Sequence, residues 1–417
     1  MGRRSLLLFP ALLLVSAAAA ELSDEDLTVS GYVDAGRFNL VDKSISGEIM
    51  SRLGAKWRID KKIDDNWSVM ADLHWLFWRN QATDIKAFHI VGLKFDADLQ
   101  GKITYESGAH RIQGGLYDFK YNPDSKNLGE YLLRSEAYPT ILESSQGKDF
   151  MAHSSSRVAG VEYDVDHGFF RQTALLYAEQ YNIPVNDISA AYLAAVGSQK
   201  AEIGFGIAYH RFLSLGEEIN TSLVAPQQAA YIEQQGLEHK AVKTSLHGRL
   251  DFGAILEMED NFKLYGEVAL LGLKSDTLYY KNIKERVPMM MGLDIPTGGI
   301  LNTFSVEAEY FANPYYGRKY LAKNLGGSNF SPLPYIDNYA KAALPKYARD
   351  DWKWSVYAHK ALNSWVDLKV RLANDHLRLR NWDGDFEGGE PMTKVSGDQW
   401  YLLKGDWYLT ARIEFHN

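Results

Sequence analysis

The chain has 417 residues, a formal net charge of -8 and no cysteine. An acidic chain is a poor candidate for binding nucleic acid, whose phosphates need a basic face. The lack of cysteine excludes disulfides, thiolate metal sites and thiol catalysis. Hydrophobic residues make up 46% of the chain, with 25 Tyr, 18 Phe and 10 Trp, which fits either a large soluble β protein or one that crosses a membrane by strands.

The first twenty residues have the pattern of a secretory signal peptide. Arg3 and Arg4 precede an apolar run, LLLFPALLLVSAAAA, that closes on small residues. The run is shorter than the roughly twenty residues of a spanning helix, and no charged stop-transfer flank follows it. We predict a signal peptide at 1–20 and a single domain at 21–417, because no linker or low-complexity stretch divides the rest.

After the signal, apolar and polar side chains alternate with a period of two, which is typical of β-strands with two different faces. Such segments occur at 27–34, 49–59, 67–77, 203–209, 245–256, 262–270, 303–310, 354–358, 366–372 and 407–415. The strands that they indicate are longer than the usual five or six residues of soluble sheets and suit a tilted strand in a bilayer. Trp and Tyr near their ends resemble the aromatic girdles of membrane barrels.

The connections alternate in length. Short ones, such as 59–66, 96–102 and 197–199, lie between long ones at 38–46, 79–84, 119–155, 180–187, 213–240, 275–284, 312–350 and 379–397. This rhythm predicts short periplasmic turns on one rim and long extracellular loops on the other. It requires 101–119 to be one bent strand with a bulge near Gly108–Ala109. The fold class is then all-β, a closed antiparallel transmembrane barrel of 16 strands, with 18 as the alternative.

The polar face of these strands carries many charges. Unpaired charges in a dry core would each cost several kcal/mol, so we expect a wet lumen. Either the charges pair within the wall or they line a permeation path, and the two interpretations are compatible. The predicted inward-facing set is Arg52, Lys56, Arg58, Asp72, His74, Arg249, Asp251, Lys263, Glu267, Glu307, Glu309, Asp367, Lys369, Arg371, Arg412 and Glu414.

Catalytic patterns are weak. No G-x-S-x-G, H-E-x-x-H, phosphate-loop or dinucleotide motif is present. Glu307 and Glu309 would place two carboxylates roughly 7 Å apart, within the range of inverting glycosidases, but a charged wall produces such pairs by chance. We predict no enzyme activity, no catalytic residues, no metal and no cofactor.

In these features the chain resembles the porin-type outer-membrane β-barrels of Gram-negative bacteria. In that group the last strand usually ends on an aromatic residue preceded by alternating apolar residues, and the barrel-assembly machinery reads this signal. Here the pattern is carried by Trp407, Leu409, Ala411, Ile413 and Phe415. His416 and Asn417 follow the aromatic residue, which departs from the pattern. The terminal segment is also expected to close the barrel by pairing with the strand at Leu27–Arg37.

The resemblance gives loop 119–155 an expected role, because general porins fold one long loop into the lumen as a constriction. The alternative is a loop packed over the mouth. Its stretch YNPDSKNLGEYLLRS also resembles a segment of outer-membrane barrels, and NLGEYLLRS within it is compatible with a short helix. Constriction candidates are Lys120, Asp124, Lys126, Glu130, Tyr131 and Arg134.

The resemblance implies an outer-membrane channel for passive diffusion of small hydrophilic solutes. Expected partners are outer-membrane lipid and lipopolysaccharide, the assembly machinery and those solutes, but no nucleic acid; a homo-oligomer is one open arrangement. Loop 312–350, in which tyrosines interleave with Lys and Arg, could contact glycans or lipid phosphates, or could be an ordinary solvated loop. The alternatives are a non-conducting barrel with an adhesion or envelope-structural role, or a secreted β-rich enzyme acting on polysaccharide.

Overall fold

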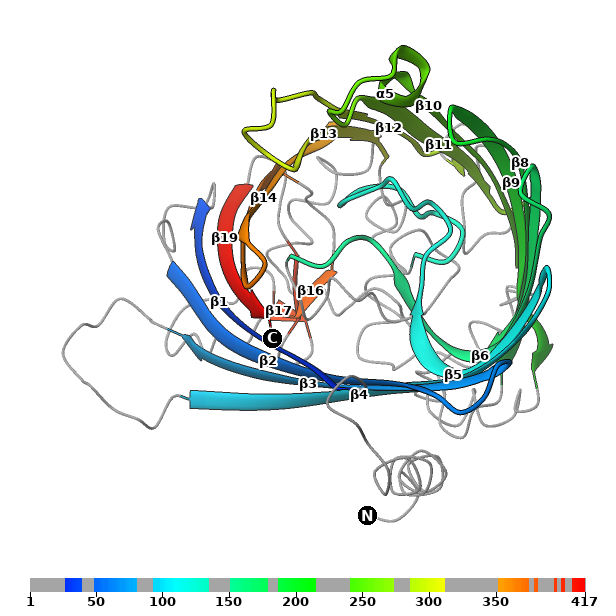
Figure 1. Ribbon diagram of the computed structural model, residues 1–417, viewed down its shortest axis with the longest axis horizontal. Coiled ribbons are helices and arrows are strands. Elements are labelled where there is room, and N and C mark those ends of the chain that lie inside the picture. The colour runs from blue at the N-terminus through cyan, green and yellow to red at the C-terminus, as the bar shows by residue number, and fades with distance from the viewer. Residues whose placement is uncertain are drawn as a thin grey trace, which may run out of the picture.

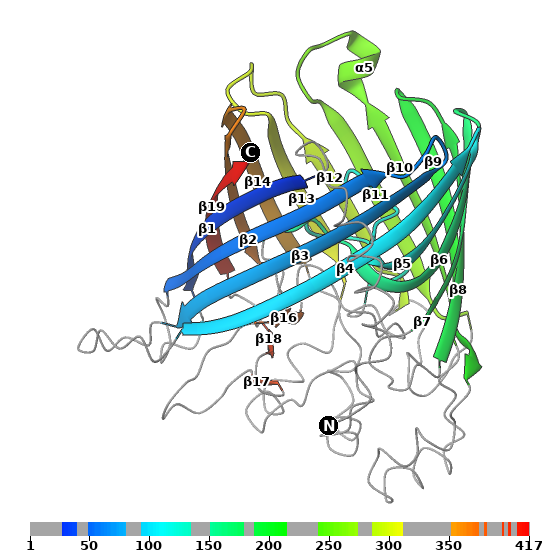
Figure 2. The ribbon, with the colours of Figure 1, turned by 60° about the horizontal axis from the view of Figure 1, so that its bottom comes forward.

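Sixteen strands pair antiparallel around a ring and close into a barrel, as predicted (Figures 1 and 2). Each strand pairs with its neighbour in sequence, and the last strand returns to the first. The strands are β1 (Leu27–Asn39), β2 (Ile49–Lys62), β3 (Trp67–Asn80), β4 (Leu93–Ser107), β5 (His110–Phe119), β6 (Ser156–Asp166), β7 (Phe170–Ala178), β8 (Asp187–Gly197), β9 (Ala201–Ser214), β10 (Ala241–Asp251), β11 (Lys263–Leu271), β12 (Met289–Asp294), β13 (Thr303–Tyr310), β14 (Trp352–Asn363), β15 (Val366–Asn374) and β19 (Trp407–His416).

The computed structural model describes residues 27–39, 49–80, 93–134, 151–178, 187–214, 241–273, 286–311, 352–374, 379–381, 394–395, 399–401 and 407–416. The expected signal peptide and loop 312–350 lie outside these residues. No helix among the described residues is long and apolar enough to cross a membrane. A small sheet of β16 (Leu379–Asn381), β18 (Gln399–Tyr401) and β17 (Lys394–Val395) lies in the connection before β19.

The alternation in the sequence sorts side chains to the two faces of the wall. Leu53, Ile203 and Met291 are exposed on the outer face, whereas alternate residues such as Tyr265 and Glu307 are buried inside. Because successive side chains of a strand point to opposite faces, one period-two pattern gives an apolar exterior and a polar interior. This is the arrangement that a lipid-facing barrel needs.

The interpretation of 101–119 as one bulged strand is wrong. β4 runs through 96–102, expected as a turn, and the chain reverses at Gly108 (φ 60), so that Ser107 pairs with His110. The polar residues of 96–102 resemble a turn because they form an inner face: Asp98 binds Arg157 and Gln100 binds Asp118. The count of 16 remains correct because the misplaced turn moves from 96–102 to 108–109.

A second difference lies after β10, where the alternating pattern through 245–256 predicts a continuous strand. The strand ends at Asp251, whose carboxylate accepts a hydrogen bond from the N–H of Ala254 (2.8 Å). This contact caps the short helix α5 (Phe252–Leu256). The apolar alternation therefore continues past the strand into the turn.

The barrel closes where β19 pairs with β1, from Ser30–His416 to Asn39–Trp407. Arg412 binds Asp34 through two nitrogens (2.6 and 2.7 Å), and its guanidinium lies 3.6 Å from the centre of the Tyr32 ring. The Tyr32 ring covers Gly54 of β2, where an added Cβ would lie 2.1 Å from the ring. Side chains from both ends of the chain thus hold the seam.

His416, the residue that follows the terminal aromatic, belongs to the last strand of the barrel. It is the last residue of β19, its N–H donates to the carbonyl of Trp365 (2.9 Å), and its ring nitrogen lies 3.2 Å from Asp367. His416 therefore continues the alternation as another inner-face residue.

Candidate functional site: the inserted loop and the lumen wall

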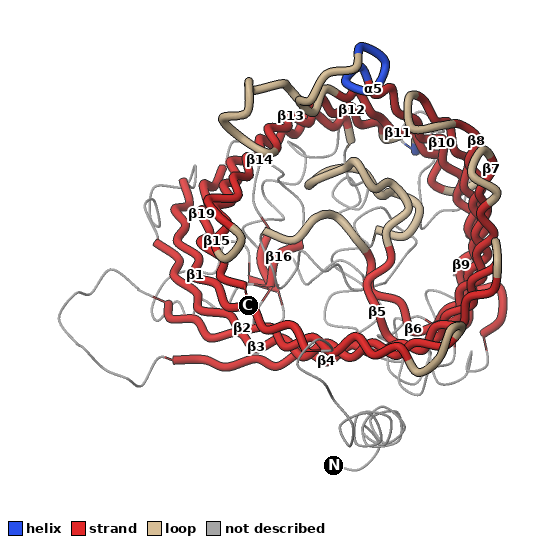
Figure 3. Tube along the Cα trace, viewed as in Figure 1, coloured by secondary structure: helices blue, strands red, loops and turns tan. Residues whose placement is uncertain are grey.

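The described residues of loop 119–155 enter the barrel. In Figures 1 and 3 the described chain after β5 lies within the outline of the ring of strands, and its hydrogen bonds to inner-face residues place it inside the barrel. Its described parts, 120–134 and 151–155, contact inner-face residues of β6, β9, β10, β11, β13, β14, β15 and β19. Tyr121, Leu132 and Leu133 of the loop join Tyr117 and Tyr177 of the wall in one apolar cluster. The lumen is therefore partly filled by a packed core.

Three wall carboxylates hold the centre of the loop by its backbone. The N–H groups of residues 126, 127 and 128 donate to Glu307, at 2.5, 2.8 and 3.0 Å. Those of residues 130 and 131 donate to Glu267, at 2.8 and 3.0 Å. Between them the N–H of Gly129 donates to Glu309 at 3.2 Å. Six consecutive amides thus bind side chains of the wall, and the expected short helix is replaced by this arrangement.

The turn in this segment depends on Gly129. Its φ is 82°, a left-handed value that glycine adopts at little cost. An added Cβ would lie 3.1 Å from a carboxylate oxygen of Glu267 and 3.1 Å from Met290. A side chain here would therefore strain the backbone and push the loop away from the wall.

Cations complete the attachment. Arg134 and Lys353 both reach the buried carboxylate of Glu309, at 2.6 and 3.2 Å. Arg371 donates to the carbonyls of Lys126 and Ala152, each at 3.1 Å, and so joins the two described arms of the loop. Removal of one partner from a buried ion pair costs roughly 3–5 kcal/mol, because the other charge is left uncompensated.

Burial also shifts the titration of the loop's own groups. Burial raises the pKa of Glu130 to about 8, although nearby Lys120 and the N–H groups of Tyr121 and Asn122 oppose the shift. Burial likewise lowers the pKa of Lys120 to about 8. His153, buried among cations, has its pKa lowered to about 2. The docked loop therefore favours neutral forms of these groups.

The six constriction candidates belong to this docked loop. Lys120 donates to the carbonyl of Ser125, and Asp124 lies near Lys263 (3.4 Å) and Arg249 (3.6 Å) of the wall. Asp124, Lys126, Glu130, Tyr131 and Arg134 are all buried. They contact the wall and one another, and their role in a constriction stays a prediction.

The predicted inward-facing charges divide into two groups, of which the first meets the loop. It comprises Arg249, Lys263, Glu267, Glu307, Glu309 and Arg371. Four of the six, the three glutamates and Arg371, are buried. The expectation of a wet lumen therefore fails at those four positions, because loop amides and cations replace water as their partners.

The second group forms ion pairs and hydrogen bonds along the wall itself. These are Lys56–Asp72, Arg58–Asp60, His74–Tyr32, Asp251–Lys263, Asp367 with His359 and His416, Lys369–Glu414, and Arg412–Asp34. Arg52 occupies a β2 position opposite Asp34, and its side chain is outside the described part of the structure. A function of these residues in permeation stays a prediction.

Several inner-face residues were not among the predictions. They lie mainly on β5 to β10 and β14: Arg111, Glu162, Asp164, Arg171, Glu202, Lys243 and Lys353. In β5 to β7 the signal was polar residues at alternate positions, such as Arg111 with Gln113 and Arg171 with Thr173. The misplaced turn concealed this alternation.

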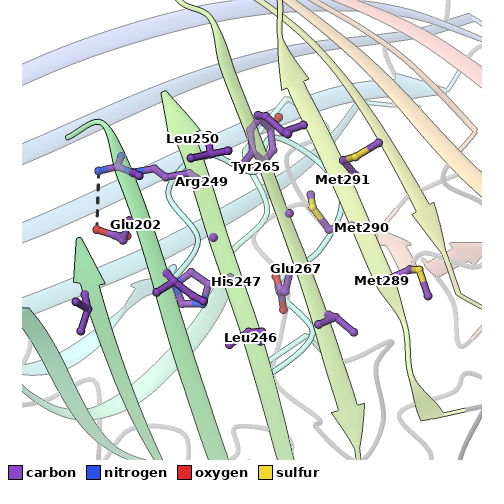
Figure 4. A pocket seen from close by; sticks show the side chains of 17 residues that line it. Glu202, Leu246, His247, Arg249, Leu250, Tyr265, Glu267, Met289, Met290 and Met291 are labelled. Atoms are coloured by element: carbon purple, nitrogen blue, oxygen red, sulfur yellow. Dashed lines mark ion pairs between the residues drawn. The ribbon is translucent and has the colours of Figure 1, made fainter. Parts of the chain in front are cut away.

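A hollow of about 750 Å³ is lined by residues of β10 to β12 and their neighbours. Gly248 and Gly266 pair across it without side chains. Figure 4 shows the two faces: Leu246, Leu250, Met289 and Met291 are exposed, whereas His247 and Glu267 are buried on the loop side. No group of three or more His, Asp or Glu among the described residues could hold a metal ion.

No protein-family model matches the chain, and no curated protein matches it. Among solved structures, two mutants of Rhodopseudomonas blastica porin are similar, each with 8% identity and a TM-score of 0.44, over 94% of this chain and 99% of that chain. A third, described as "Asymmetric conductivity of engineered proteins", has 9% identity with the same score and coverage. At a TM-score of 0.44 this likeness assigns neither a family nor a function.

Proposed function

We propose that the chain is an outer-membrane, porin-like channel for passive diffusion of small hydrophilic solutes, exported by the signal peptide at 1–20. The observation that carries the proposal is the contrast between the two faces of a closed barrel. The outer face exposes apolar side chains such as Leu53 and Ile203, which suits lipid. The inner face of β2, β5 and β7 holds half-exposed cations in ion pairs, which require water.

The proposal includes partners and assigns no catalysis. Outer-membrane lipid and lipopolysaccharide would surround the barrel, and the assembly machinery would read the terminal alternation that ends at Phe415. A homo-oligomer remains one arrangement. Glu307 and Glu309, the carboxylates that resemble a glycosidase pair, bind loop amides and cations. They are thus occupied by the protein's own groups, which favours a wall function over that of a polysaccharide-acting enzyme.

The second candidate is a barrel that does not conduct and serves adhesion or envelope structure. The burial of the inserted loop favours it, since Leu128, Tyr131 and Leu132 have no exposed surface. A plug fixed by six backbone hydrogen bonds would block part of the lumen. The two candidates differ in whether water and ions pass beside the docked loop.

Single-channel recording in planar bilayers tests the proposal with the purified full chain. Discrete conductance steps are expected, with swelling of liposomes in small sugars as an independent measurement. Correctly folded protein, identified by heat-modifiable electrophoretic mobility, that gave no steps and no swelling would exclude the channel and support the non-conducting barrel. Recovery in a soluble fraction without detergent would exclude both.

A further inference from the structure

Three cations on the inner wall of β2 to β9 are more exposed than the carboxylates that they bind. The side chain of Lys56 is 44% exposed, whereas its partner Asp72, 2.9 Å away, is 6% exposed. The side chain of Arg111 is 43% exposed, against 3% for Glu162 at 3.2 Å and 15% for Asp164 at 2.7 Å. In each of these pairs the cation is more exposed than the carboxylate.

A third pair repeats the arrangement on the next part of the wall. The side chain of Arg171 is 43% exposed and binds Glu202, which is 8% exposed. Glu202 also lies 3.8 Å from Arg249 (Figure 4), so two cations share one buried carboxylate. Arg58 on β2 is a counter-example, because its partner Asp60 is equally exposed. Arg157 of β6 shows the reverse, because its side chain is 7% exposed, against 15% for Asp98 and 32% for Asp118. The asymmetry therefore belongs to the pairs of Lys56, Arg111 and Arg171.

Arg111 and Arg171 lie close enough to act together. Arg111 pairs across β5 and β6 with Asp164, and Asp164 pairs with Thr173 of β7, two residues from Arg171. Two strand spacings separate β5 from β7, about 10 Å. That distance is comparable with the Debye length of about 10 Å at 0.1 M salt. A small ion between them would feel both guanidinium groups.

The cations of this arc stay half-exposed beside the described residues of the loop. The hydrogen bonds of the described loop residues go mainly to β9 to β15, and Leu132 and Leu133 pack with Tyr117 of β5 and Tyr177 of β7. Arg111 and Arg171 lie six positions from these tyrosines along the same strands, about 20 Å away. In the pairs of Lys56, Arg111 and Arg171 the cation is the more exposed end, so each of these pairs is a dipole with its positive end toward the lumen. Oriented charge on a low-dielectric wall raises the local concentration of the opposite ion.

We propose that the lumen selects for anions, and that Lys56, Arg111 and Arg171 determine this selectivity. The solutes favoured are small anions such as chloride, phosphate or carboxylates, which arginine binds through its remaining N–H groups. The inference rests on the proposed channel function. It concerns which ions the channel favours and involves no chemical reaction.

The test is the reversal potential of single channels in a gradient of potassium chloride. The wild type should show a chloride-to-potassium permeability ratio above 1, falling toward the ratio of free mobilities as salt rises and screening increases. The double variant Arg111→Gln with Arg171→Gln should lower the ratio about twofold or more, because two unit charges near the path are lost. Asp72→Asn should raise it, because Lys56 would lose its counter-charge.

Matched controls separate electrostatics from folding. Arg111→Lys with Arg171→Lys keeps the charge and should keep the ratio. Lys62→Gln removes a cation from the end of β2, where it pairs with exposed Asp65, and should change the ratio least. Heat-modifiable mobility checks that each variant folds.

The outcomes distinguish the two proposals. Absence of conductance overturns the channel, and the inference with it. Conducting wild-type channels that prefer potassium overturn the anion selectivity alone. Equal permeability ratios in the wild type and the double glutamine variant would likewise overturn the anion selectivity and leave the channel intact.

Discussion

At the scale of single residues, we expect His153 to couple docking of the loop to pH. Its ring packs edge-on against Tyr357 (5.3 Å between centres), and burial together with Lys120, Arg371, Lys126 and Lys369 lowers its pKa to about 2. The docked residue therefore stays neutral, whereas in an undocked loop it would take up a proton near pH 6.5. Its contribution to docking is complete above pH 6.5 and is lost as the pH falls, by about 1.4 kcal/mol per unit.

We expect amide hydrogen exchange in residues 126–131 to accelerate from pH 7 to pH 5 in the wild type relative to His153→Gln, after correction for intrinsic rates. The comparison with this variant is needed because Glu130, whose pKa is raised to about 8, titrates with the opposite sign. Its protonated form favours docking, so its contribution falls as the pH rises from about 4.5. This contribution is common to both proteins. Parallel pH profiles would show that His153 does not control docking.

At this scale the sequence predicts the face of a residue but not its partner. The alternation places Glu267, Glu307 and Arg412 inside because a strand fixes side-chain direction every second residue. It contains no information on what lies opposite. The partner of Glu307 is a backbone segment about 180 positions away, and backbone amides have no sequence signature. The wet environment expected for these carboxylates is wrong for that reason.

At the scale of elements, segment 126–131 is held by distinct carboxylates, so its amides should respond separately. In Glu307→Gln the amides of residues 126–128 lose a charged acceptor, a loss of about 1.5–3 kcal/mol. Their exchange should become about 10- to 100-fold faster, whereas residues 130 and 131, held by Glu267, should change less. Site-resolved hydrogen exchange measures both.

Glu267→Gln is the matched control, with the reverse pattern expected: faster exchange at 130 and 131 and a smaller change at 126–128. Equal acceleration of all six amides in both variants would mean that the segment undocks as one unit. Unchanged exchange in both would contradict the structural role of the two carboxylates.

Strands can be predicted from the sequence where their two faces differ in polarity. The prediction fails where a strand pattern and the residues typical of a turn occur in the same segment. Segment 96–102 contains the Asp, Gln and Gly residues of a turn, yet its inner-face residues bind Asp118 and Arg157. Polar residues are favourable on the inner face of a strand that lines a lumen. Residue types alone do not distinguish such a strand from a turn. Insertion of loop 119–155 was one of two alternatives, since its docking depends on wall residues distant in sequence.

At the scale of the whole molecule, closure and strand number follow from the sequence better than any site does. Backbone groups that face lipid must all be paired, so a chain of alternating strands has to join its last strand to its first. The seam shows how specific this closure is: Arg412 meets Asp34 and Tyr32 across β19 and β1. The terminal alternation predicted the pairing, and the side-chain contacts emerged only with the fold.

The terminal strand gives the last prediction, because its apolar stripe serves both the closed barrel and, on our proposal, recognition by the assembly machinery. Phe415 is 48% exposed on the outer face. Phe415→Ala should lower the yield of heat-modifiable barrel in the membrane several-fold. The matched control is Val33→Ala, since Val33 is 47% exposed on the same face of β1 and pairs with Ile413. Both variants remove lipid-facing apolar surface beside the seam, a loss worth about 25 cal/mol per Å², but only Phe415 lies in the terminal signal. A large defect in Phe415→Ala with a small one in Val33→Ala would indicate recognition, whereas equal defects would reduce Phe415 to an ordinary lipid contact.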